Sequence, residues 1–129
     1  MPSKTQAVGL SLVFVGGALG SSARYAIELA FAGFPNNSLI STSIVNLLGA
    51  LALGFVNSHP YFQLPKRNLF FVVGLLGSFT TMSGLAAISA GADLGLGLDG
   101  LFYWLFVGAQ LLIGVLLYHL GVKIAGGKR

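Results

Sequence analysis

Four long apolar runs divide the chain, and each is long enough to cross a membrane as a helix. They cover roughly residues 7–31, 39–57, 69–90 and 101–122. A helix needs about 20 predominantly apolar residues to span the hydrocarbon core of a bilayer. Pro and Gly interrupt the connections between the runs, where helices are expected to end. The pattern predicts an all-α integral membrane protein with four transmembrane helices in one domain, residues 1–129.

Composition agrees with a membrane protein. The chain is 55% hydrophobic and 8% charged, whereas soluble domains carry charge at about a quarter of their positions. Cys is absent, which excludes disulfides, thiolate metal sites and a Cys nucleophile. The net charge of +4 is spread over seven Lys and Arg, and scattered cations do not form the basic patch that nucleic acid requires.

The basic residues follow the topology of the four runs. Arg24 falls on one side of the membrane, together with Glu28, Asp93 and Asp99. Short cytoplasmic loops carry an excess of Lys and Arg. The other side carries six basic residues: Lys4, Lys66, Arg67, Lys123, Lys128 and Arg129. This excess of basic residues on one side predicts a multi-pass protein of the plasma membrane with both termini in the cytoplasm.

A ridge of residues spaced by four runs along the first span. Gly16 and Gly20 form a GxxxG pair, which lets another backbone approach closely. Arg24 and Glu28 continue the ridge. A salt bridge between them is one interpretation. The other is that Arg24 is a positive residue at the vestibule of an anion pathway.

Side chains with hydrogen-bond donors lie within the second and fourth spans. Thr42 and Asn46 are four apart with Gly49 on the same face, and Gln110 shares a face with Tyr103. Amide and hydroxyl hydrogens can be donated to an anion. The alternative is hydrogen bonding between neighbouring helices.

The third span contains an unusual segment from Gly74 to Gly84. Three glycines and four hydroxyl residues interrupt an apolar run near its middle. Such a composition favours a break in the helix, and released carbonyls are tolerated at membrane depth only when buried in protein or lining a cavity. Carbonyls without a carboxylate suit a monovalent cation such as Na⁺. The alternative is an unbroken helix whose hydroxyls bond back to carbonyls one turn earlier.

Enzymatic chemistry is not expected. A hydrolase needs a nucleophile with a base in reach, and the only conceivable pair, Ser83 and His119, lies at different depths.

A small multidrug exporter also has four spans, but its embedded carboxylate would have to be Glu28, near a helix end. A drug-resistance assay with Glu28→Gln would separate that alternative.

Three segments together resemble the CrcB/Fluc family of fluoride channels. The resemblance covers the first three spans in order and spacing, while the fourth span agrees only in hydropathy and a few glycines. The segments are Gly16-Gly17-Ala18-Leu19-Gly20 with Arg24-Tyr25, Ser41-Thr42-Ser43-Ile44-Val45-Asn46-Leu47-Leu48-Gly49, and Gly74-Leu75-Leu76-Gly77-Ser78-Phe79-Thr80-Thr81.

The resemblance implies an antiparallel dimer with two fluoride pores and a structural Na⁺ at its interface. Backbone carbonyls of Gly77 and Thr80 would hold the Na⁺. The amide of Asn46 would face the pore, with Thr42 one turn away and Arg24 at the vestibule. The fluoride pathway implied in this chain comprises Arg24, Thr42, Asn46, Thr81, Met82, Ser83, Leu85 and Gln110.

Two departures from the family pattern point to a heterodimer. The family carries two Phe rings whose positive edges line the pore, but here those positions are Met82 and Leu85, with Gly84 between them. The charge bias also fixes one orientation, so the chain cannot pair with itself in antiparallel fashion. We therefore predict a homologous partner subunit of opposite orientation. A non-conducting structural subunit of a fluoride channel is the alternative.

Overall fold

We describe the fold from a computed structural model, in which residues 3–90 and 100–126 are described, the side chains of 87–90 and 100–103 excepted. Asp93, Asp99, Lys128, Arg129 and the Tyr103 side chain, which entered the sequence predictions, lie outside these residues.

The described residues are helical, and no strand occurs among them. Four helices among the described residues are long and apolar enough to cross a membrane, which confirms the four-span prediction. The third span is a composite of four short segments that follow a 3₁₀ turn. The elements are α1 (Lys4–Ala30), α2 (Asn37–Ser58), η1 (Pro60–Gln63), α3 (Pro65–Asn68), the π-helical η2 (Leu69–Leu76), α4 (Gly77–Phe79), α5 (Met82–Ala90) and α6 (Gly100–Ile124).

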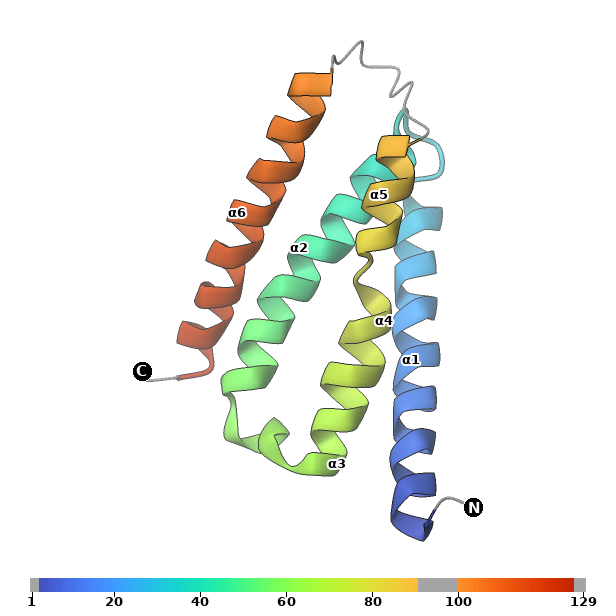
Figure 1. Ribbon diagram of the computed structural model, residues 1–129, viewed down its shortest axis with the longest axis vertical. Helices are drawn as coiled ribbons and strands as arrows, with labels where there is room; N and C mark the ends of the chain where they lie inside the picture. The colour runs from blue at the N-terminus through green and yellow to red at the C-terminus, as the bar shows by residue number, and fades with distance from the viewer. Residues whose placement is uncertain (1–2, 91–99, 127–129) are drawn as a thin grey trace.

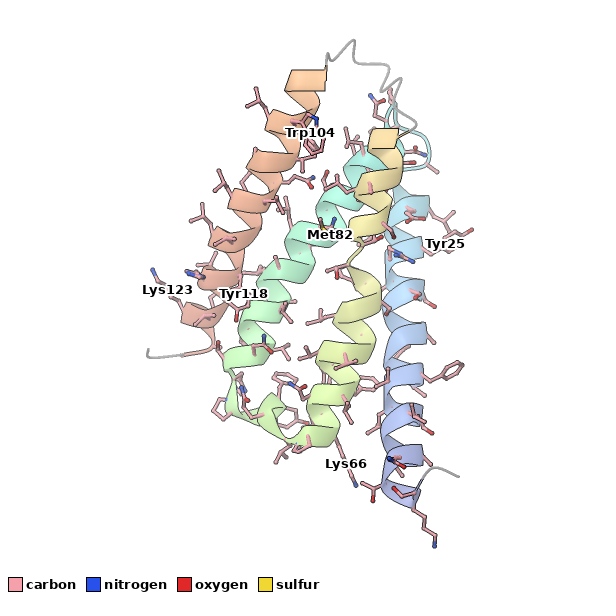
Figure 2. All side chains as sticks on the ribbon, viewed as in Figure 1. Tyr25, Lys66, Met82, Trp104, Tyr118 and Lys123 are labelled. Carbon is pink, nitrogen blue, oxygen red and sulfur yellow. The ribbon has the colours of Figure 1, made fainter. Side chains whose placement is uncertain are left out.

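The spans lie side by side in the order α6, α2, third span and α1, so that α2 contacts both α6 and the third span (Figure 1). Successive spans alternate in direction, and the start of α1 and the end of α6 lie toward the same end of the molecule. The side chain of Lys66 also lies toward that end (Figure 2), and Lys123 is in the last turn of α6. The grouping of all six basic residues on one side, and the cytoplasmic location of that side, stay predictions.

Helix boundaries differ from the sequence prediction in two places. The first helix begins at Lys4 rather than near Ala7, because Ser3 and Gln6 form a capping box at its start. The connection predicted as a loop over residues 58–67 contains η1 and α3. Pro60 and Pro65 open these two segments, since Pro is preorganised for the first position of a helix.

Glycines bring α1 directly onto the third span. A Cβ on Gly16 would lie 2.4 Å from the carbonyl oxygen of Phe70, and a Cβ on Gly20 would lie 2.1 Å from that of Leu75. The Ser78 hydroxyl also donates to the carbonyl of Gly17 at 2.8 Å. Lipid is as apolar as the side chains, so close packing of this kind is what associates helices in a bilayer. The ridge of the first span is therefore a packing surface.

Two other glycines join α2 to α6. A Cβ on Gly54 would lie 2.0 Å from the carbonyl oxygen of Tyr118, and a Cβ on Gly121 would lie 2.2 Å from that of Leu51. The two backbones therefore cross without intervening side chains. This crossing holds α6, whose main neighbour is α2.

Most of the apolar surface remains uncovered. The accessible surface is 8283 Å², against about 6,500 Å² expected for a compact monomer of this mass. Such an apolar exterior suits lipid and a partner protein. Within the part of the chain that the structure describes, the buried apolar side chains are Leu39, Val45, Val56, Leu76 and Leu85.

Adjacent glycines on α1 provide a matched test of this packing. Gly16→Val puts a side chain against the Phe70 carbonyl, and we expect it to destabilise the fold by about 1–3 kcal/mol. Gly17→Val meets no atom within 4 Å at its Cβ and should change stability by less than about 0.5 kcal/mol. The midpoint of thermal unfolding in detergent measures both. Equal effects would contradict a close contact at Gly16.

Candidate functional site

The third span is interrupted between α4 and α5, at Thr80 and Thr81. Thr80 has φ −77° and ψ 153°, an extended conformation that ends the helical ladder. Its N–H and hydroxyl still donate to the Leu76 carbonyl, at 3.1 and 3.0 Å. The predicted break is therefore present. Backbone groups released at such a break need partners within the protein when it lies in a bilayer.

Asn46 on α2 supplies those partners to Thr81. Its Oδ1 accepts a hydrogen bond from the Thr81 N–H at 2.8 Å, and its Nδ2 donates to the Thr81 carbonyl at 3.0 Å. One side chain thus pairs both backbone groups of one residue. An amide carries two N–H donors, and this contact uses one of them. The second remains for another acceptor.

The same contacts release two carbonyls. In an unbroken helix the Gly77 carbonyl would accept the Thr81 N–H, but that N–H donates to Asn46. The Thr80 carbonyl would accept the Gly84 N–H, which donates instead to the Thr81 hydroxyl at 3.0 Å. These are the two carbonyls that the family resemblance implies as Na⁺ ligands.

The Thr81 side chain also begins the second half of the span. Its hydroxyl accepts from the N–H of Gly84, the third residue of α5, as an N-cap does. It also lies 3.1 Å from the hydroxyl of Ser83. The start of α5 therefore carries hydroxyl groups beside the positive end of a helix dipole.

A groove of about 610 Å³ lies between α2, α6 and the third span. Most of its wall is apolar, and Tyr118 and His119 lie in the part nearest the C-terminal end of α6. Figure 2 shows Met82 beside the break and Tyr118 on α6, nearer the C-terminal end of that helix. The groove brings together, from the residues predicted for the site, Asn46, Gly77, Thr80, Met82, Leu85 and Gln110.

Ser43 is a site residue that the sequence reasoning missed. Gln110 is buried, at 8% exposure, and its Nε2 donates to the Ser43 hydroxyl. That hydroxyl in turn donates to the Leu39 carbonyl at 2.6 Å. The signal was available in the sequence, because Ser43 is three residues before Asn46 and so lies on a neighbouring part of the same helical face.

Other predicted residues lie outside the groove wall. Thr42 is buried, with its hydroxyl 3.5 Å from the position of a Cβ on Gly84. Thr81 and Ser83 stand at the start of α5 and are not among the residues that line the groove. Arg24 is half-buried on α1. The alternative interpretation of Arg24 and Glu28 as a salt bridge is not supported, because no ion pair within 4.0 Å joins these two described residues.

Met82 and Leu85 have different surroundings although both line the groove. The Met82 side chain is 64% exposed, whereas Leu85 is 4% exposed. Neither carries an aromatic ring, so this chain offers no ring edge at either position. The exposed thioether faces space that another protein surface can cover.

The fold and site define a class: a small four-span membrane protein whose broken third span lines an open groove. Residues 11–122 match the family described as CrcB-like protein, Camphor Resistance (CrcB). The chain therefore belongs to the CrcB family.

Named relatives match along most of their length. A fluoride-specific ion channel FluC 1 of Methanospirillum hungatei is 41% identical over 118 residues, covering 88% of this chain and 76% of that protein. A fluoride-specific ion channel FluC of Nitratidesulfovibrio vulgaris is 38% identical, covering 86% and 91%. Another from Thermus thermophilus is 38% identical, covering 89% and 94%. The family does not favour the exporter alternative, and Glu28 is exposed near the end of α1.

The contact between Gln110 and Ser43 can be tested against a matched serine. Ser43→Ala removes the acceptor of a buried amide, and we expect a loss of about 1–3 kcal/mol. The hydroxyl of Ser41 is also buried but bonds only to a carbonyl of its own helix, that of Ser38. Ser41→Ala should therefore change the thermal midpoint much less. An equal loss in both variants would argue against the interhelical bond.

Proposed function

We propose that this chain is one subunit of a passive, fluoride-selective channel that exports fluoride across the plasma membrane, with both termini in the cytoplasm. The observation that supports this function most directly is the broken third span, which Asn46 holds beside an uncovered groove. The names of the relatives support fluoride as the ion. The role is conduction, with no catalytic step.

The donors along the groove suit a small anion. Fluoride is strongly hydrated, so a pathway has to replace its water with N–H and O–H groups. Each amide has two N–H donors, and within the described part of the chain Asn46 and Gln110 each donate only one of them, which leaves the second for an anion. The hydroxyl of Thr42 and those of Thr81 and Ser83 continue the set nearby. Passive flow also requires that no single site binds tightly, and neutral donors meet that condition.

Positive potential supports entry of an anion. The start of α5 presents the positive end of its dipole at the break. Arg24, without an ion-pair partner within 4.0 Å among the described residues, contributes a full positive charge at the vestibule in this proposal.

The residues at the break fit a structural Na⁺. The Gly77 and Thr80 carbonyls have lost their helical donors, and both residues line the groove. Carbonyl oxygens without carboxylates match a hard monovalent cation. Among the described residues no cluster of three His, Cys, Asp or Glu side chains is found. Backbone oxygens are therefore the ligands that this chain would contribute, and the bound ion would fix a dimer interface.

A homologous subunit of opposite orientation would complete the groove. Six of the seven basic residues belong to one side of the topology, which fixes this chain in one orientation. Met82 and Leu85 supply no ring edge, so aromatic edges for fluoride have to come from the partner. Both features favour a heterodimer over an antiparallel homodimer. A non-conducting structural role for this chain within that dimer is the second candidate, favoured by the same two side chains.

Fluoride efflux from proteoliposomes tests the proposal. We expect efflux when this chain is reconstituted with a homologue of opposite charge bias that retains both ring positions, and little efflux from this chain alone. Chloride efflux from the same vesicles should stay at background. A fluoride-selective electrode measures the first and a chloride electrode the second.

The possible outcomes separate the parts of the proposal. Efflux from this chain alone would keep the channel and refute the heterodimer. Absence of efflux from the chain and from the mixture would refute the channel. If Asn46→Ala in this chain leaves the mixture's rate unchanged, this subunit's own pathway does not conduct and the structural role holds.

A further inference from the structure

The connection between α2 and the third span is an ordered structure, which we call the basic turn (residues 59–68). The His59 Nδ1 accepts from the Tyr61 N–H at 3.2 Å, and the Phe62 ring packs edge-on against Phe71 with centroids 4.9 Å apart. The side chain of Gln63 donates to the carbonyl of Asn57. The turn is therefore fixed to both helices that it joins.

The guanidinium of Arg67 is held on the outside of this turn. Its Cζ lies 3.7 Å from the centroid of the Tyr61 ring, and its Nη1 donates to the Tyr61 carbonyl at 3.0 Å. Arg carries five N–H donors. The Arg67 guanidinium donates no further hydrogen bond to the described part of the chain. A stacked, oriented guanidinium with remaining donors is suited to bidentate binding of phosphate.

Among the described residues no acidic side chain forms an ion pair with the cations of the turn. Lys66 is exposed next to Arg67, and the three acidic residues, Glu28, Asp93 and Asp99, all belong to other segments. Two adjacent cations at the end of a membrane span attract anionic headgroups by about 1 kcal/mol each.

An apolar groove begins beside these cations. It has a volume of about 520 Å³ and lies between the first turns of α1 and Leu69, with Gly9 and Val13 in its wall. Lys66 is three residues before Leu69 and therefore shares its helical face. In Figure 2 the side chain of Lys66 lies near the start of α1. Tyr61 and Leu64 are 52% and 53% exposed, as expected at a membrane interface, where Tyr is enriched.

We propose that the basic turn binds an anionic phospholipid. Lys66 and Arg67 hold the headgroup phosphate, and one acyl chain lies in the groove between α1 and Leu69. The occupant is a lipid rather than a soluble phosphate because the groove is apolar and starts at the interfacial end of two spans. This site is separate from the groove at the break and does not depend on fluoride conduction.

Thermal unfolding of the full-length chain in a non-ionic detergent tests the proposal. Added phosphatidylglycerol should raise the midpoint in a saturable manner, and phosphatidylcholine should not. Lys66→Gln leaves the contact between Arg67 and Tyr61 intact and should weaken apparent phosphatidylglycerol affinity about fivefold. Arg67→Lys keeps the charge but loses the fork and the stacking, and should weaken affinity as well. Gly9→Leu should weaken it without any change of charge, since it fills the groove.

Lys123→Gln is the matched control, because it removes one charge from the last turn of α6, away from the basic turn. It should change the affinity less than twofold. The proposal fails if Lys123→Gln and Lys66→Gln act equally, since the effect would then be general charge attraction. It also fails if glycerol phosphate gives the same shift as the lipid, or if phosphatidylglycerol gives none.

Discussion

The contact between the amide of Asn46 and the backbone of Thr81 is the interaction on which the rest of the site depends. A span that stops being helical inside a bilayer exposes an N–H and a carbonyl, and each unpaired group there costs several kcal/mol. Asn46 pairs both groups at 2.8 and 3.0 Å. Because the amide takes the Thr81 N–H, the Gly77 carbonyl loses its helical donor. The break and the released carbonyl are thus two results of one contact.

Close glycine packing holds this contact in position. A Cβ on Gly49, one turn from Asn46, would lie 2.1 Å from the Thr80 methyl, so α2 touches the break at two successive levels. Gly16 and Gly20 fix the other side of the third span against α1. With three spans in contact and α6 attached through Gly54 and Gly121, the groove stays open on one face. That face is where our account requires a second subunit.

Much of this could be predicted from residue types and spacing. Long apolar runs gave the four spans, the hydroxyl and glycine cluster gave the break, and the polar positions Asn46 and Gln110 line the groove as expected. The rest depends on tertiary contacts that spacing does not encode. Whether Arg24 pairs with Glu28 depends on rotamers, and which hydroxyl accepts from Gln110 depends on how α6 crosses α2. The turns at Pro60 and Pro65 were missed because Pro both ends and begins helices.

The most direct test of the account is the sodium dependence of stability in the wild type and in Asn46→Ala. The thermal midpoint would be measured in Na⁺ and in N-methylglucamine at equal ionic strength, with the partner subunit present. Asn57→Ala, an exposed Asn on the same helix, is the control. We predict that Na⁺ raises the midpoint of the wild type and of the control but not that of Asn46→Ala. An equal Na⁺ effect in all three proteins would show that the Asn46 contact does not create the carbonyl site.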